Sequence, residues 1–93
     1  MVIGVLQLQL SIPESNSLKD KRSVLKGALE RTRNRFNVSV AETGLNDRWR
    51  SAEVAIVAVG NSTEHVHSVC SKVLEFYQSQ PWFVVTDCST QIL

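Results

Sequence analysis

The residues most suited to chemistry are basic side chains that gather in one short stretch of the chain. Residues 17–36 hold seven of the ten Lys and Arg residues but only two acids, Asp20 and Glu30, which leaves an excess of five positive charges. The net charge of the whole chain is only +1, so the remaining residues offset this excess. Phosphate is an anion that both Lys and Arg bind well, which makes a phosphate-bearing partner the first hypothesis.

The spacing of these residues is typical of one helical surface. At about 100° per residue, four of them fall in a narrow stripe beside the apolar face, and the others flank its far side. Such a stripe can meet successive phosphates of a nucleic acid backbone. The alternative is a solvated face whose long side chains cover the rim of the core. The stripe comprises Lys19, Arg22, Lys26 and Arg33, and the full candidate set for RNA or anion binding is Lys19, Lys21, Arg22, Lys26, Arg33 and Arg35.

Other reactive side chains form no recognisable catalytic or metal-binding group. His65 and His67 are two residues apart, a spacing that points them in different directions on a helix. Cys70 falls on an apolar helix face and Cys88 closes a strand. Their wide separation favours two free thiols in a reducing cytoplasm, with a disulfide as the less favoured alternative. We therefore expect a protein that is not an enzyme and that uses no metal and no cofactor.

Hydrophobic periodicity divides the chain into six elements and one domain, 1–93. Leu6, Leu8 and Leu10 alternate with polar residues, as in a half-buried strand, and Ser17 is a good N-cap for the basic helix. The expected elements are strands over 2–12, 37–43, 52–59 and 82–88, helices over 18–35 and 63–79, and a tail over 88–93.

The order of these elements, β-α-β-β-α-β, is typical of an α+β, ferredoxin-like fold. We expect a four-stranded antiparallel sheet with the strand order 4-1-3-2 and two helices on one face. The first and third strands are the most hydrophobic and are expected at the centre, because central strands are buried on more sides than edge strands.

The third predicted strand is apolar on both faces, although the two helices can cover only one. An exposed apolar patch of this kind usually marks a contact with a partner. We expect a homodimer, formed through the open face of the sheet or an edge strand, with cover by the tail or a long loop as the alternative. Trp49, in a polar loop, either plugs the helix layer or anchors an interface. The interface candidates are Ile3, Val5, Ala55, Val57, Val59 and Trp49.

Two segments carry a resemblance to a known family. Residues 17–25, SLKDKRSVL, and residues 33–42, RNRFNVSVAE, resemble the YlxP-like family of small bacterial proteins, and Trp49 and residues 52–61 fit the same pattern. The resemblance covers essentially the whole chain and implies a ferredoxin-like fold. It carries over no catalytic residue, because the family's function is not known. Its genes often lie beside those for translation initiation factor two and ribosome-binding factor A, which implies a role near the ribosome or RNA by association.

The sequence thus favours a non-enzymatic binding module that contacts RNA or a ribosomal surface through the basic helix. The central strands carry no aromatic residue for base stacking, so any RNA contact is expected to read shape and phosphate. The alternative is a homodimeric protein-interaction or regulatory protein without nucleic-acid binding. The short, uncharged start of the chain does not resemble a signal peptide or membrane span, so we expect a cytoplasmic protein with no membrane partner.

Overall fold

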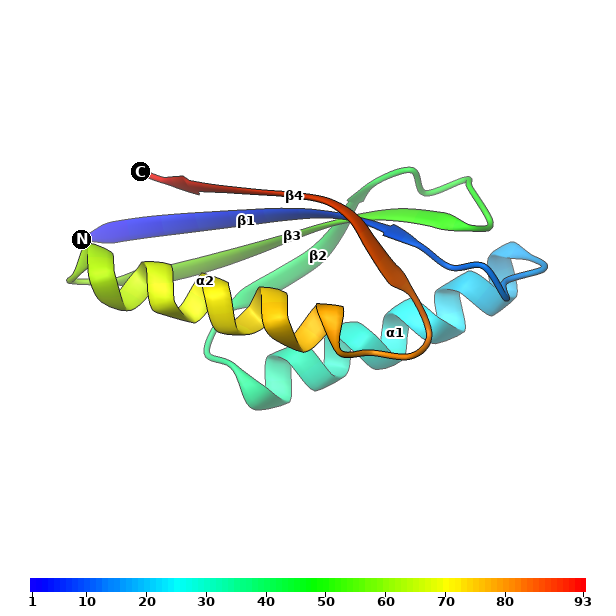
Figure 1. The fold of residues 1–93 in the computed structure, drawn as a ribbon, viewed down its shortest axis with the longest axis horizontal. Coiled ribbons are helices and arrows are strands. Elements are labelled where there is room, and N and C mark those ends of the chain that lie inside the picture. The colour runs from blue at the N-terminus through cyan, green and yellow to red at the C-terminus, as the bar shows by residue number, and fades with distance from the viewer.

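A computed structural model describes residues 1–93 of the chain. The predicted topology is confirmed: four antiparallel strands form one sheet in the order β2-β3-β1-β4, and two helices pack on it (Figure 1). The elements are β1 (Val2–Ser11), α1 (Leu18–Arg35), β2 (Ser39–Gly44), β3 (Ser51–Gly60), α2 (Thr63–Gln78) and β4 (Val84–Ile92).

The two central strands are the longest and run in register along their whole length. Val2 of β1 lies opposite Gly60 of β3, and the pairing continues without interruption to Ser11 and Ser51. Because strand side chains alternate between faces, every second residue of β1 points to the helix side. There Leu6 and Leu8 are fully buried, which explains the alternation visible in the sequence.

The core lies between this face of the sheet and the two helices, which cover the same side (Figure 1). Helix α2 buries Val66, Cys70 and Val73, a spacing of four and three residues that keeps them on one face. It approaches β1 closely at Gly4, where an added Cβ would lie 2.5 Å from a methyl carbon of Val66. Gly4 therefore permits the close packing of α2 on the central strand.

The two helices are joined by a buried polar contact and an aromatic one. The hydroxyl groups of Thr32 on α1 and Tyr77 on α2 are 2.8 Å apart, and Thr32 also donates to the Ala28 carbonyl at 2.7 Å. The rings of Phe36 and Phe76 meet edge to face, with 5.7 Å between their centroids. Both contacts fix the position of α1 relative to α2.

The predicted tail over 88–93 is wrong, because β4 continues to Ile92. Ile92 lies opposite Gly4, and Leu93 exchanges two backbone hydrogen bonds with Ile3, at 3.2 and 2.7 Å. These last residues satisfy the free backbone groups along the outer side of β1. The sequence did not indicate the strand because β4 is an exposed edge and lacks a regular apolar alternation.

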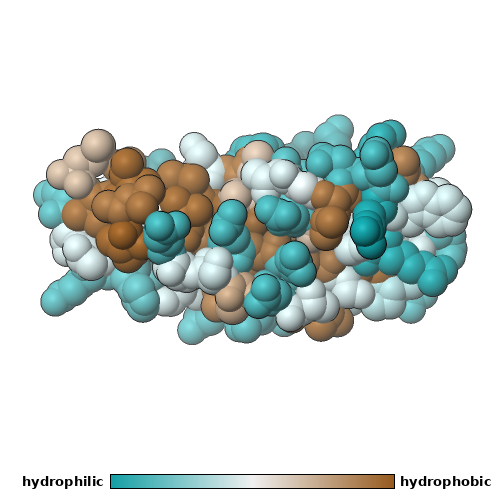
Figure 2. All heavy atoms as spheres, turned by 90° about the horizontal axis from the view of Figure 1, so that it is seen from above, coloured by the Kyte–Doolittle hydropathy of each residue, from teal (hydrophilic) through white to brown (hydrophobic).

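The other face of the sheet carries no helix, and its two ends differ in polarity. Figure 2 shows an apolar area at the end near both chain termini, whereas polar side chains prevail towards the other end. The molecule is elongated, with principal extents of 42 × 21 × 17 Å, so these ends are well separated. Neither helix is long and apolar enough to cross a membrane.

Candidate nucleic-acid interface on the first helix

Helix α1 is fixed at its start by two reciprocal hydrogen bonds. The Ser17 hydroxyl accepts from the backbone N–H of Asp20 at 3.0 Å, and the Asp20 carboxylate accepts from the backbone N–H of Asn16 at 3.0 Å. This arrangement is close to a capping box, shifted by one residue on the carboxylate side. At the other end, the N–H of Phe36 donates to the Thr32 carbonyl at 2.9 Å. The side chains on α1 are thus presented from a well-terminated helix.

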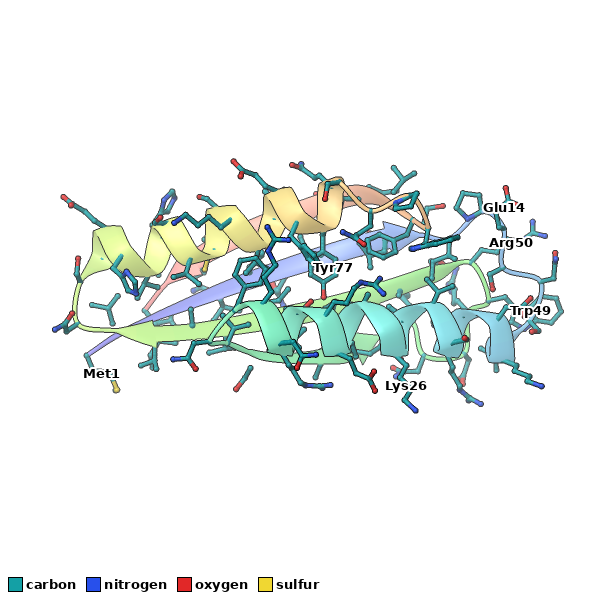
Figure 3. The ribbon with its side chains drawn as sticks, turned by 90° about the horizontal axis from the view of Figure 1, so that it is seen from below. Met1, Glu14, Lys26, Trp49, Arg50 and Tyr77 are labelled. Atoms are coloured by element: carbon teal, nitrogen blue, oxygen red, sulfur yellow. The ribbon has the colours of Figure 1, made fainter.

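Four exposed cations follow one flank of α1, and we call them the cationic stripe. From Lys19 to Arg33 the helix rises by about 21 Å, at 1.5 Å per residue. Lys26 points away from α2 on the outer side of α1 (Figure 3). The chain has one ion pair, and it involves Lys21, which is not one of these cations. No carboxylate oxygen therefore lies within 4 Å of any of the four. The stripe consists of Lys19, Arg22, Lys26 and Arg33.

Arg33 shows where the stripe lies in the fold. Its guanidinium group donates one hydrogen bond to the backbone carbonyl of Val40, at 3.1 Å. Val40 belongs to β2, the edge strand beside α1, so the stripe runs along this edge of the molecule. Arg33 remains exposed, and its other N–H groups have no hydrogen-bond partner in the protein. Glu30 lies four residues after Lys26 without forming an ion pair with it.

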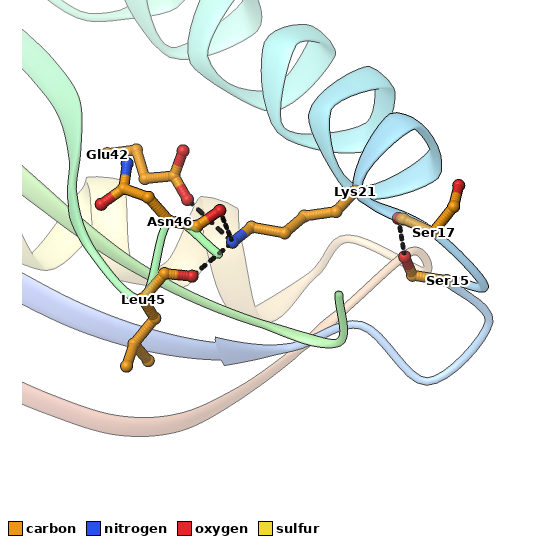
Figure 4. A network of polar contacts seen from close by, with 6 residues as sticks. All are labelled: Ser15, Ser17, Lys21, Glu42, Leu45 and Asn46. Atoms are coloured by element: carbon orange, nitrogen blue, oxygen red, sulfur yellow. Dashed lines mark hydrogen bonds and ion pairs between the residues drawn. The ribbon is translucent and has the colours of Figure 1, made fainter. Parts of the chain in front are cut away.

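The structure contradicts the prediction that Lys21 binds RNA, because its side chain is buried. The ammonium nitrogen lies 3.0 Å from Oε2 of the Glu42 carboxylate. This oxygen is buried, and the ion pair with Lys21 is its one polar contact. The ammonium group also donates to the carbonyls of Leu45, at 2.6 Å, and Asn46, at 3.4 Å (Figure 4). Leu45 has a positive φ of 59°, so Lys21 stabilises the strained start of the turn that follows β2.

Helical spacing already contained the signal for this burial. Lys21 precedes the buried residues Leu25, Ala28 and Thr32 by four, seven and eleven positions, which places all four on one face of α1. A cation at such a position needs a buried partner, because burying an unpaired charge is costly. The partner, Glu42, lies in the second segment that carries the family resemblance.

Arg35, the remaining candidate, lies on the flank of α1 that faces the other helix. Its guanidinium carbon is 5.4 Å from the ring centroid of Phe76 and 5.8 Å from that of Phe36. These distances are those of cation–π contacts, which hold Arg35 against the aromatic pair. The side chain of Arg31 lies over Gly27 on α1. Neither Arg31 nor Arg35 therefore extends the cationic stripe.

Trp49 does not plug the helix layer, because its side chain is 55% exposed. It projects at the end of the molecule that also carries Glu14 and Arg50 (Figure 3). Arg50 ties this loop to the turn before α1 by donating to the Ser15 carbonyl at 2.9 Å and to the Asn16 side chain at 3.4 Å. The apolar interface candidates Ile3, Val5, Ala55, Val57 and Val59 all lie on the sheet face opposite the helices, away from Trp49.

The cysteines and histidines are not brought together. Cys70 is buried in the core, where desolvation raises the pKa of its thiol, whereas Cys88 is exposed on β4. His65 and His67 are exposed near the start of α2. No three His, Cys, Asp or Glu residues are grouped so that they could hold a metal ion.

Comparison with known proteins agrees with the resemblance. Residues 3–90 match the family described as "Protein of unknown function (DUF503)". The chain is also similar to "Uncharacterized protein YlxP" of Bacillus subtilis (strain 168), with 39% identity over 80 residues that cover 86% of this chain and 87% of the relative. The match spans both the cationic stripe and the Lys21–Glu42 pair. The chain therefore belongs to the DUF503 family, whose function is not known.

Proposed function

We propose that this protein is a non-enzymatic binding module that contacts RNA, free or at the ribosomal surface, through the cationic stripe. The observation that carries the proposal is the state of Lys19, Arg22 and Lys26, which are exposed on one flank of α1 and have no carboxylate partner. Unpaired cations on one flank attract the phosphates of a nucleic acid. When the cations bind these phosphates, the counterions condensed on the nucleic acid are released, which favours binding. The cytoplasm is the compartment we propose for this function.

The geometry favours backbone contacts over base recognition. A stripe of about 21 Å can meet several phosphates along one strand or across a groove, and phosphate contacts carry no sequence information. The sheet face without helices has no aromatic residue on β1 or β3, so it offers no platform for base stacking. We expect weak binding that depends strongly on salt and little on sequence, because only four cations contribute.

The proposal of a non-enzymatic role rests on how the reactive groups are distributed. Cys70 is buried, Cys88 lies on an edge strand, and the two histidines lie near the start of α2. A catalytic site requires several of these groups to converge on one reacting atom. Their separation supports binding as the activity of this domain.

A charge-reversal experiment tests the proposal. We expect the variant Lys19→Glu/Arg22→Glu/Lys26→Glu to bind a fluorescein-labelled single-stranded or hairpin RNA roughly tenfold or more weakly than the wild-type protein at low salt. The matched control, Arg31→Glu/Arg48→Glu/Lys72→Glu, changes the net charge equally but leaves the stripe intact. An equal loss of affinity in both variants, or no measurable binding by the wild-type protein, would overturn the proposal.

A second candidate function is a dimeric protein-interaction or regulatory protein that binds no nucleic acid. It is favoured by one observation, the exposed apolar end of the open sheet face, where Val59 is 62% exposed. This candidate predicts that the wild-type protein forms dimers but does not bind RNA, even at low salt.

A further inference from the structure

The open sheet face ends in a patch of apolar side chains next to both chain termini, which we call the terminal patch. It is built from neighbouring strands, since Ile3 lies opposite Val59 and Val5 lies opposite Val57. Leu93 extends it through its backbone hydrogen bonds to Ile3. Val59 and Leu93 are 62% and 63% exposed, so the patch faces solvent in the single chain (Figure 2).

The remainder of the same face is polar and carries negative charge. Gln9 of β1 lies opposite Glu53 on one side and Asp87 on the other, so two carboxylates flank the same position of the central strand. These residues line a shallow hollow together with Gln7 and Ser89. The open face therefore carries acidic side chains beyond its middle and no charged side chain at the terminal patch.

We propose that the terminal patch is the contact surface of a homodimer, in which a second copy of the chain packs face to face on it. Flat sheet faces rich in Val and Ile pack on each other at a separation of about 10 Å, and two-fold symmetry brings the same patch of each copy together. The charge distribution limits how far the two faces overlap. Complete overlap would desolvate Glu53 and Asp87 without a cationic partner, whereas an axis through the patch leaves both anionic ends outside the contact.

The size of the patch sets the expected strength of this dimer. Half of the 42 × 17 Å outline of the open sheet face corresponds to about 360 Å² of projected surface in each copy. The two copies together then bury about 700 Å², which is below the roughly 1,000 Å² of a stable specific interface and in the range of weak, transient contacts. We therefore expect a weak, concentration-dependent dimer with a dissociation constant in the micromolar range or above.

Face-to-face packing would place the helices of both copies on the outside of the dimer, because they cover the opposite side of each sheet. The two cationic stripes would then lie on outer surfaces and remain accessible. The dimer is independent of the proposed RNA binding, so either can fail in experiment while the other holds.

The test is the molar mass of the protein in solution over a wide concentration range, measured by sedimentation velocity with a reducing agent present. The reducing agent prevents disulfide links through the exposed Cys88. We expect the mass to rise from monomer to dimer with concentration. A wild-type protein that remains monomeric at every concentration up to the millimolar range would overturn the proposal.

Two matched variants locate the interface. Val59→Asp places a charge in the terminal patch of both copies, and we expect it to weaken dimerisation roughly tenfold or more. Val84→Asp is the control, because Val84 is similarly exposed, at 56%, but lies opposite Ser11 at the far end of the sheet. We expect its dimerisation to equal that of the wild-type protein.

A third variant guards against misfolding, since a substitution in a central strand can affect stability as well as association. The variant is Leu93→Asp. Leu93 lies at the end of the chain described here, and its exposed side chain belongs to the same patch. We expect the variant to weaken the dimer like Val59→Asp while circular dichroism and the melting profile stay native. Dimers that persist in both patch variants, or that are lost equally in Val84→Asp, would contradict the assignment.

Discussion

The ammonium group of Lys21 on α1 and the carboxylate of Glu42 on β2 lie 3.0 Å apart and form the one ion pair of this chain. The pair joins the two sequence segments that carry the resemblance, residues 17–25 and 33–42. It holds the first helix against the edge strand and stabilises the turn that begins at Leu45. The neighbouring cations of the stripe remain unpaired.

Removing Lys21 should destabilise the fold. We predict that Lys21→Met lowers the free energy of unfolding by about 2–4 kcal/mol, because it leaves Glu42 and two turn carbonyls without their partner; the partial exposure of Glu42 limits the loss. Lys19→Met, two residues earlier on the exposed flank, should change it by less than about 0.5 kcal/mol. Urea unfolding of both variants provides the measurement, and equal stabilities would contradict a structural role for Lys21.

The double variant Lys21→Met/Glu42→Leu extends this test. Replacing both partners by apolar residues removes the uncompensated charge, so we predict that it is more stable than Lys21→Met alone. If the double variant were the less stable of the two, the loss in Lys21→Met would not come from the stranded Glu42 carboxylate.

The single tyrosine of the chain should ionise at a higher pH than a free tyrosine. Burial raises the pKa of Tyr77, while the hydrogen bond to Thr32 and the charges of Arg31 and Arg33 oppose the shift. The unfolded chain then loses this proton at a lower pH than the native state, so stability is retained below about pH 10 and falls as the pH rises above it. Absorbance at 295 nm reports this titration, and ionisation at the pKa of free tyrosine in the native protein would contradict the burial.

Two glycine substitutions should act in opposite directions. In Gly4→Ala the new methyl group would lie 2.5 Å from Val66 and 3.1 Å from the Cys70 sulfur, and we predict a loss of about 1–3 kcal/mol. In Gly27→Ala it would meet only the mobile end of Arg31, so the higher helix propensity of Ala should stabilise the protein by up to about 1 kcal/mol. Melting temperatures distinguish the two, and a Gly4→Ala variant as stable as the wild type would show that α2 can move away.

The two thiols should differ in reactivity. Cys88 is exposed on β4 and should react rapidly with a disulfide reagent, whereas Cys70 is buried and its pKa is raised by desolvation. We predict one fast thiol in the native protein and a second that reacts only as the protein unfolds. Cys88→Ser should abolish the fast phase, and a fast phase that persists in this variant would show that Cys70 is accessible.

The sequence was sufficient for the topology because the central strands carry strong patterns. Leu6, Leu8 and Leu10 alternate with polar residues, and β3 is apolar on both faces, so hydrophobicity places these two strands at the centre of the sheet. The β-α-β-β-α-β order of the elements supplies the rest of the strand order. The end of β4 could not be predicted in this way, because its exposed residues make their contacts through backbone hydrogen bonds to β1. Such bonds leave no mark on side-chain composition.

The candidate site was predictable only in part. The helical spacing correctly placed Lys19, Arg22 and Lys26 on an exposed surface. Charge alone wrongly predicts a surface role for Lys21, because this residue lies on the buried face of α1. Its partner could not be identified from the sequence, since Glu42 lies on another element and is brought close only by the docking of α1 on β2.

The most direct test of the central claim is the salt dependence of RNA binding. If the four cations of the stripe contact phosphates of single-stranded RNA, log K should fall with log salt concentration with a slope of about −2.8, or about −0.7 for each contact. Lys26→Gln should make this slope shallower by about 0.7, whereas Lys72→Gln on α2 should leave it unchanged. A slope near zero, or one that responds equally to both substitutions, would contradict a phosphate-binding stripe on α1.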